Sequence, residues 1–100
     1  MTDSEKIYEF LKGHDLAVLS TVTSDFLPES AVIGFSQNEN LELIFGTSSE
    51  SRKYKNLMKN PRVALVIGWD KGQTLQYEGE AVELKTQSGR QEVINIHLSK

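Results

Sequence analysis

The sequence predicts a small, mainly antiparallel β-barrel with accessory helices, formed by one domain. Five segments have the length and residue types of strands, most of them are joined by short polar turns, and helical periodicity is confined to three short segments. Strands joined by short turns favour antiparallel pairing, and closing such a sheet into a barrel removes its exposed edges. The chain of 100 residues has the size of a single domain.

The N-terminal third predicts one helix and two strands. Thr2 and Glu5 have the spacing of a capping box, and Gly13 is expected to end the helix that they begin. Residues 16–22 are apolar and β-branched, which is typical of a strand. A connection that contains Pro28 follows, and residues 29–35 are expected to form the second strand.

The middle of the chain changes from a strand period to a helix period. Residues 36–40 predict a polar turn, and residues 41–46 predict the third strand. Tyr54, Leu57 and Met58 then recur at helical spacing, so a helix is expected over residues 51–60. Pro61 ends it, because the residue before a proline is pushed out of helical geometry.

The last third predicts two more strands and a final helix. Residues 63–69 are almost continuously apolar, and residues 70–72 have the composition of a tight turn. Residues 74–84 alternate, which predicts a long strand with a bend or bulge at Gly79. Residues 88–98 are expected to form an amphipathic helix that packs on the barrel.

Basic side chains are concentrated in one stretch of an acidic protein. Residues 50–62 contain five of the eleven Lys and Arg residues and a single acid, whereas the rest of the chain has six basic and thirteen acidic residues. A nucleic-acid binder usually presents a wide basic face, and the acidic remainder would repel a polyanion. The distribution favours a small anion held at one place and argues against a nucleic-acid partner.

The composition excludes several kinds of site. The chain has no cysteine, which excludes disulfides, zinc–thiolate sites and iron–sulfur clusters. His14 and His97 lie far apart in sequence and have no carboxylates at ligand spacing, so no metal site is expected. No apolar run approaches the ~18 residues that span a bilayer. We therefore expect a cytoplasmic protein without a membrane partner.

The segment most informative about function is the start of the central helix, where hydroxyl residues precede two cations. Arg52 and Lys53 occupy a helix N-terminus, which prefers acids by roughly 0.3–1 kcal/mol. Their placement is explained if an anion binds there, because free backbone N–H groups and the hydroxyls of Thr47 and Ser51 could also donate to it. The charge pattern alone leaves open the alternative that both cations are ordinary solvated residues.

Short motifs in a fixed order resemble the FMN-binding split-barrel family. The similarity is to its pyridoxamine 5′-phosphate oxidase-like branch, especially short bacterial proteins described as general stress proteins, and it covers residues 15–84. Its most specific part is Ser-Arg-Lys at 51–53 ahead of Asn-Pro-Arg-Val at 60–63. The other matching segments are Leu-Ser-Thr-Val at 19–22 with Pro28, Phe-Gly-Thr at 45–47, Asn-Leu at 56–57, Ala-Leu-Val at 64–66 with Trp69, and Tyr-Glu-Gly-Glu-Ala at 77–81.

This resemblance implies a split barrel that forms a homodimer, with FMN in the cleft between subunits. Carried over by position, the FMN phosphate would be held at the start of the central helix, the isoalloxazine ring would lie along the second strand and contact it partly through backbone groups, and a later strand would add a polar contact. The corresponding residues are Thr47, Ser51, Arg52 and Lys53 for the phosphate, Ser30, Ala31, Val32 and Ile33 for the ring, and Thr74 or Gln76 for the further contact.

The chain also departs from the true oxidases of that family. They carry an arginine and a lysine on the second strand, at positions that are Ala31 and Ser36 here. They also take substrate-binding residues from a C-terminal region, and the family's last barrel strands are expected after Lys100. Oxidation of pyridoxamine phosphate itself is therefore not implied.

Three readings of the function stay open. The first is an FMN-dependent oxidoreductase that acts on a small-molecule substrate or electron donor, with the flavin supplying the chemistry. The second is a non-catalytic flavin-binding or stress-related protein. The third is a deazaflavin- or haem-binding relative; haem would need a histidine at the cleft, and neither His14 nor His97 is an evident candidate.

Overall fold

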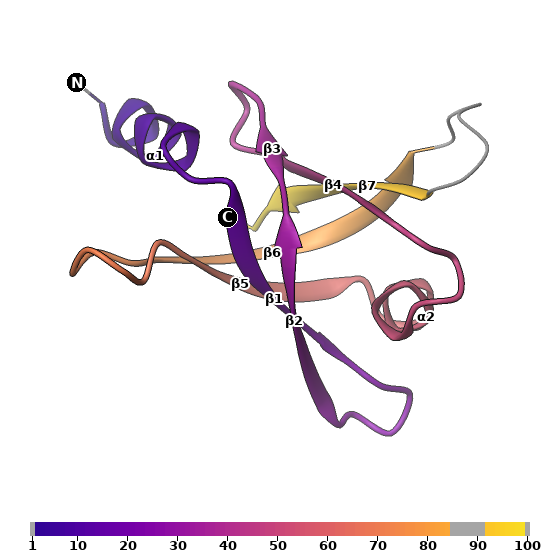
Figure 1. Cartoon of the computed structure of the whole chain (residues 1–100). Coiled ribbons are helices and arrows are strands. Elements are labelled where there is room, and N and C mark those ends of the chain that lie inside the picture. Colours follow the sequence, from indigo (N-terminus) through magenta and orange to yellow (C-terminus); the bar gives the residue numbers. More distant parts are fainter. Residues whose placement is uncertain (1, 85–91, 100) are drawn as a thin grey trace.

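The computed structural model describes residues 2–84 and 92–99, which form two helices and one seven-stranded sheet (Figure 1). The helices are α1 (Asp3–Lys12) and α2 (Arg52–Lys59). The strands are β1 (Leu16–Val22), β2 (Pro28–Gly34), β3 (Ser36–Gln37), β4 (Leu43–Thr47), β5 (Arg62–Ile67), β6 (Leu75–Leu84) and β7 (Glu92–Leu98). The sheet order is β2-β1-β5-β6-β7-β4-β3, and every neighbouring pair is antiparallel.

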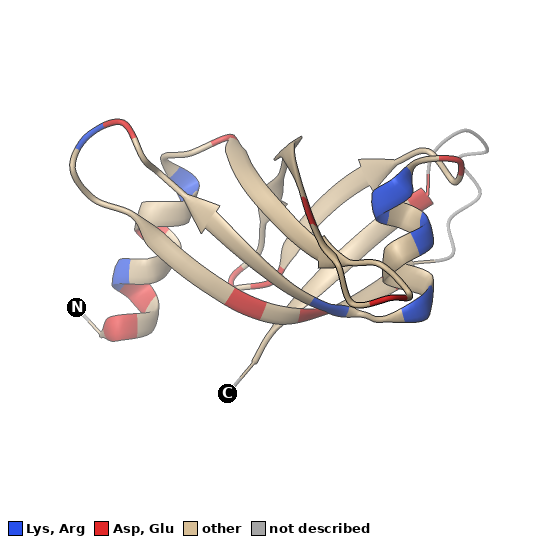
Figure 2. Ribbon diagram, turned by 90° about the horizontal axis from the view of Figure 1, so that it is seen from below, with Lys and Arg blue, Asp and Glu red and all other residues tan. Residues whose placement is uncertain are grey.

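The predicted fold class is confirmed. The sheet curves into a half-barrel, with β2 and β3 at its two edges, and the two helices lie at opposite ends of it (Figures 1 and 2). The capping box at the start of α1 is present, since the Glu5 backbone N–H donates to Thr2 Oγ1 at 3.1 Å and the Thr2 N–H donates to Glu5 Oε1 at 3.1 Å. Among the described residues, no helix has the length and apolar character needed to cross a membrane.

Two element predictions are wrong. The expected C-terminal helix is the strand β7 over its described part, and residues 88–91 of the prediction lie outside the described residues. The expected turn at 36–40 begins as the short strand β3, which pairs with β4. The chain therefore has seven strands in its described part, against the five expected.

Residues 92–98 form a strand and not a helix because they pair with strands that are distant in sequence. Val93, Ile94 and Ile96 fit either a helix face or a strand. In the fold, β7 lies between β6 and β4 and is bonded to both, and Ile94 and Ile96 are fully buried. Backbone hydrogen bonds to two neighbouring strands and the burial of both isoleucines stabilise the strand by more than the weak helical preference of these residues would stabilise a helix.

The core lies on the inner face of the half-barrel. Alternate residues of β1, β4 and β5 point inward, and α1 and α2 each contribute a leucine. Tyr77 on β6 is buried, and its hydroxyl donates to the carbonyl of Leu41. Burial raises the pKa of the Tyr77 phenol, which stays protonated as a donor. The largest fully buried side chains are Leu11, Leu19, Leu43, Leu65, Ile67, Ile94 and Ile96.

Gly79 marks a close approach of two strands. The register is continuous there, with Gly79 opposite Val63 on β5 and Leu98 on β7, so the expected bulge is absent from this position. A Cβ atom on residue 79 would meet the backbone carbonyl oxygen of His97 and lie 2.8 Å from Ile96 Cγ2. Glycine therefore lets β7 approach β6 at this point.

Candidate functional site

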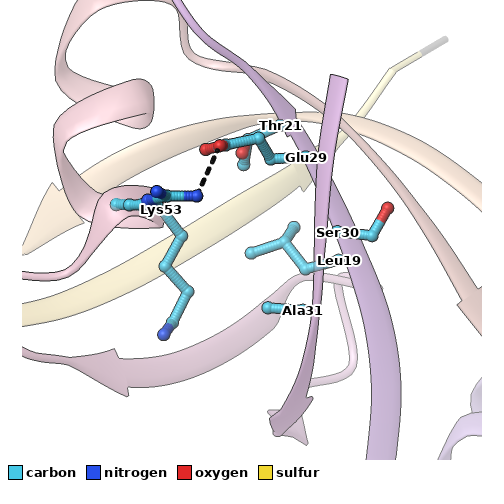
Figure 3. A pocket seen from close by; sticks show the side chains of 7 residues that line it. Leu19, Thr21, Glu29, Ser30, Ala31 and Lys53 are labelled. Atoms are coloured by element: carbon cyan, nitrogen blue, oxygen red, sulfur yellow. Dashed lines mark hydrogen bonds and ion pairs between the residues drawn. The ribbon is translucent and has the colours of Figure 1, made fainter. Parts of the chain in front are cut away.

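A pocket of about 470 Å³ lies where the first turn of α2 faces β1 and β2 (Figure 3). It brings together two of the predicted phosphate residues, Arg52 and Lys53, and two of the predicted ring residues, Ser30 and Ala31. Its volume is within the usual range of small-molecule sites, about 300–1,000 Å³. The residues that line it are Leu19, Thr21, Glu29, Ser30, Ala31, Arg52 and Lys53.

The sequence just before α2 fixes where the helix begins. Ser51 is the N-cap residue, because its Oγ accepts the N–H of Tyr54 at 3.2 Å and donates to the carbonyl of Ser48 at 2.9 Å. Thr47 Oγ1 lies 2.9 Å from Ser51 Oγ. Both hydroxyls therefore serve the cap and neither residue lines the pocket, so their part in anion binding stays a prediction.

The first turn of α2 contains no acid and begins with two cations. Figure 2 shows a group of basic residues on this helix, with acidic residues spread over α1 and the sheet. A helix N-terminus already carries partial positive charge, and the cations of Arg52 and Lys53, which line the pocket, add to it. This arrangement attracts an anion.

Lys53 and Arg52 meet different surroundings. The Lys53 side chain extends along Leu19 towards Ala31, into the pocket (Figure 3). No ion pair of Lys53 occurs among the described residues. Arg52 is 87% exposed, and its Nη1 lies 3.2 Å from Glu29 Oε2 on β2.

Glu29 and Asn56 are site residues that the sequence analysis did not identify. Asn56, one turn along α2 from Arg52, is buried, and its Nδ2 donates to Glu29 Oε1 at 2.8 Å and to Thr21 Oγ1 at 3.0 Å. The alternation of β2 places Glu29 on the same face as Ala31 and Ile33. For Glu29, the only indication in the sequence is this inward-facing position directly after Pro28.

The predicted ring residues are divided between the two faces of β2. Ala31 lines the pocket and Ile33 is buried in the core, whereas Val32 is 61% exposed on the outer face. The Ser30 hydroxyl points away from Lys53 (Figure 3) and lies 2.9 Å from Ser20 Oγ. Among the described strands β2 lies at an edge of the sheet and pairs only with β1, so its other backbone edge is available to a ligand.

The structure does not bring Thr74 and Gln76 to this pocket. Thr74 lines a separate depression of about 520 Å³ between α1 and the connection from β5 to β6. Gln76 is exposed on the outer face of β6, opposite Val66. Neither residue lines the pocket that contains Arg52.

The other side of α2 is attached to β6 through a tyrosine and a pair of carboxyls. Tyr54 Oη donates to Glu83 Oε2 at 2.7 Å, and this bond raises the pKa of Tyr54 to about 12. The hydrogen bond with Glu83 and the negative charge of Glu83 also raise the pKa of Glu92 above its ordinary value. Glu92 is the first residue of β7 and lies opposite Thr47.

We expect Glu92→Gln to raise the melting temperature at about pH 7. Because the folded protein holds the Glu92 proton more tightly than the unfolded chain, the stability associated with this group is present at low pH and is lost as pH rises through the folded pKa. An amide can donate to Glu83 without ionising, so the variant should lack this loss. Thermal unfolding of both proteins at about pH 4 and pH 7 checks it. Parallel pH dependences would contradict the Glu83–Glu92 interaction.

Comparison with known proteins identifies related chains. The family model described as pyridoxamine 5′-phosphate oxidase matches residues 3–97. The chain is 32% identical over 65 residues to the pyridoxine/pyridoxamine 5′-phosphate oxidase of Ehrlichia ruminantium (strain Welgevonden), a match that covers 65% of this chain and 34% of that protein. The oxidase of Ehrlichia chaffeensis is 35% identical over 54 residues, which are 54% of this chain and 27% of that protein.

The chain thus spans about a third of the length of the curated relatives it matches. The expectation that further barrel strands follow Lys100 stays a prediction.

Solved structures share the fold. A Listeria innocua protein provisionally assigned as a pyridoxamine 5′-phosphate oxidase has a TM-score of 0.87 at 23% identity, covering 97% of this chain and 94% of that chain. General Stress Protein 26 of Bacillus anthracis has a TM-score of 0.84 at 24% identity, covering 98% and 90%. The haem storage protein HutZ of Vibrio cholerae has a TM-score of 0.82 at 17% identity, covering 100% and 92%. At these identities the likeness establishes the fold alone.

Proposed function

The chain belongs to the pyridoxamine 5′-phosphate oxidase family, and from this premise we propose that it binds FMN between two copies of itself and catalyses flavin-dependent oxidation or reduction of a small molecule. The observation that carries the proposal is the cationic first turn of α2, which opens onto a 470 Å³ pocket beside the edge strand β2. Membership of the family indicates which cofactor to expect, and the pocket is where we propose that it binds.

The residues present fit a flavin mononucleotide. A phosphomonoester needs cations and hydrogen-bond donors, and Arg52 offers a planar fork of N–H groups while Lys53 offers a compact charge inside the pocket. The planar ring needs a flat wall with donors and acceptors, and the free backbone edge of β2 offers both. Bound FMN would supply the redox chemistry, and the chain would orient it and limit its contact with water.

A second copy of the chain is proposed to pack against β2, the strand that forms one wall of the pocket. Val32 on the outer face of β2 is 61% exposed, and it lies in a row across the sheet with Val18 and Val66. Gln76 is the next residue in that row. An apolar face of this kind is expected to be covered by a partner. In a homodimer that buries this row, Gln76 would lie at the interface, where the family places a further polar contact.

Flavin binding tests the proposal most directly. The protein should quench the fluorescence of added FMN on titration and bind riboflavin, which lacks the phosphate, at least about tenfold less tightly, because charge-assisted bonds to the phosphate are lost. Sedimentation equilibrium should show a dimer. A protein that leaves the fluorescence of both flavins unchanged, or a tight monomer in the presence of FMN, would refute the proposal.

Catalysis needs a separate measurement. With FMN bound, the protein should accelerate oxidation of a reduced nicotinamide beyond the rate of free FMN at the same concentration. Binding without acceleration would favour the second candidate, a non-catalytic flavin-binding protein. That candidate is supported by the pocket lining, whose only ionisable acid, Glu29, is already held by Arg52 and Asn56.

Haem binding, one part of the third hypothesis, receives no support from the histidines. His14 stacks on Phe10, and its Nδ1 lies 2.8 Å from the Phe10 carbonyl oxygen. His97 Nδ1 lies 2.6 Å from Glu42 Oε2. Neither histidine lines the pocket beside α2.

A further inference from the structure

The proposed phosphate pocket contains a carboxylate of its own. Glu29 Oε2 lies 3.2 Å from Arg52 Nη1, and Glu29 Oε1 accepts a hydrogen bond from Asn56 at 2.8 Å. The Glu29 side chain is 30% exposed, whereas Arg52 is 87% exposed. The only guanidinium that lines the pocket therefore already has an anionic partner, and that partner belongs to the protein.

The two members of this ion pair differ in how firmly they are held. Asn56 is buried, and its amide donates hydrogen bonds to both Glu29 and Thr21. It therefore holds the Glu29 carboxylate in place where β1 ends and β2 begins. Arg52 has one contact with Glu29 at the end of a long exposed side chain. When another anion approaches, Arg52 can turn towards it, while Glu29 stays in place.

We propose that Glu29 is an affinity-setting residue of the phosphate pocket: it occupies Arg52 in the free protein and remains beside a bound phosphomonoester as a fixed negative charge. This inference rests on the proposed function and concerns how tightly the same site binds. A phosphate must displace Glu29 from Arg52 and then lie near an uncompensated carboxylate, and both effects lower its affinity. The flavin is therefore held as an exchangeable ligand.

The proposal predicts different effects on the binding of FMN and of riboflavin. Riboflavin has no phosphate, so its binding does not require Arg52 to leave Glu29 and is not opposed by the carboxylate. Removal of the Glu29 charge should strengthen FMN binding and leave riboflavin binding unchanged. A role for Glu29 in orienting Arg52 towards the phosphate predicts the opposite, a loss of FMN affinity.

The test is Glu29→Gln, which keeps the acceptor for Asn56 and removes the charge. Titration of intrinsic flavin fluorescence should show about fivefold tighter binding of FMN and the same affinity for riboflavin. Glu39→Gln is the matched control, because it makes the same change in net charge at an exposed turn that lines a different depression. That control should leave the affinity for both flavins as in the unmodified protein.

The outcomes are distinguishable. If the unmodified protein binds FMN and Glu29→Gln binds it equally or more weakly, the inference is wrong and the proposed function stands. Equal strengthening of FMN and riboflavin would also overturn it, because the effect would then not act through the phosphate. If the unmodified protein binds neither flavin, the proposed function fails and this inference fails with it.

A measurement on the unmodified protein does not depend on the variant folding. The Nε–H signal of Arg52 in a nitrogen–proton NMR spectrum reports the partner of the guanidinium. Addition of FMN should shift this signal as Arg52 leaves Glu29, and addition of riboflavin should leave it in place. An unchanged Arg52 signal at saturating FMN would show that the ion pair persists, and would overturn the inference.

Discussion

Arg52→Glu should abolish FMN binding while the chain stays folded. The change removes the forked donor proposed for the phosphate and places a second carboxylate beside Glu29 at the mouth of the pocket. One charge-assisted hydrogen bond is worth about 1.5–3 kcal/mol. Because the change removes a forked pair of such bonds and adds a repelling carboxylate, affinity should fall on the order of 100-fold or more, beyond the range of a fluorescence titration.

The fold should tolerate this substitution for two reasons. Arg52 is 87% exposed, and an exposed ion pair contributes at most about 1 kcal/mol. An acid in the first turn of α2 would regain roughly 0.3–1 kcal/mol from the helix dipole. The melting temperature should therefore change little.

Lys55→Glu is the matched control for Arg52→Glu. It reverses the same charge on the same helix at an exposed residue that does not line the pocket. FMN binding should persist in this variant, with at most a small loss from the longer-range field. Equal losses of FMN affinity in both variants would show that the effect comes from net charge. Retention of FMN by Arg52→Glu would show that Arg52 does not bind the phosphate.

Gly79→Ala should cause the largest loss of stability. The added Cβ would meet the His97 carbonyl oxygen and the Ile96 side chain, and neither can withdraw, because β7 is bonded to β6 and to β4. Crowding of this kind costs about 2–3 kcal/mol, which lowers the melting temperature of a domain this small by on the order of 10–20 °C. Urea and thermal unfolding both measure it.

Gly34→Ala tests whether that loss is specific to residue 79. Gly34 also lies in a strand, but a Cβ there would have only the Asp15 carbonyl oxygen at 3.8 Å, an ordinary contact. The substitution should change stability by less than about 0.5 kcal/mol. A Gly79→Ala protein as stable as Gly34→Ala would show that β6 and β7 can separate without cost.

The fold class could be predicted because the strand signals are local. The apolar and β-branched residue types in 16–22, the alternation in 74–84, and the helical spacing of Tyr54 and Leu57 each depend on neighbours within a few positions. The strand character of residues 92–98 could not, because it depends on β4 and β6, which are distant in sequence. Short apolar runs of this kind acquire their conformation from their partners.

Some residues of the candidate site could likewise be predicted from local sequence, and others could not. Arg52 and Lys53 could be predicted because a cation pair at a helix start conflicts with the local electrostatics. Glu29 could not, because its relation to Arg52 exists only once β2 lies beside α2 and Asn56 reaches across to it. The hydroxyls of Thr47 and Ser51 bond to each other and to the helix cap, and their donation to a ligand stays a prediction.

The position of β7 between β6 and β4 affects how the protein can be made. β4 spans Leu43–Thr47, and its main sheet neighbour, β7, follows it only at Glu92–Leu98. As the nascent chain leaves the ribosome, β4 and β3 can form only a two-residue pairing with each other until residues 92–98 have been translated. Contacts between segments so distant in sequence slow folding. The apolar side chains of β4 are thus exposed to chaperones, or to neighbouring nascent chains, until β7 has been synthesised.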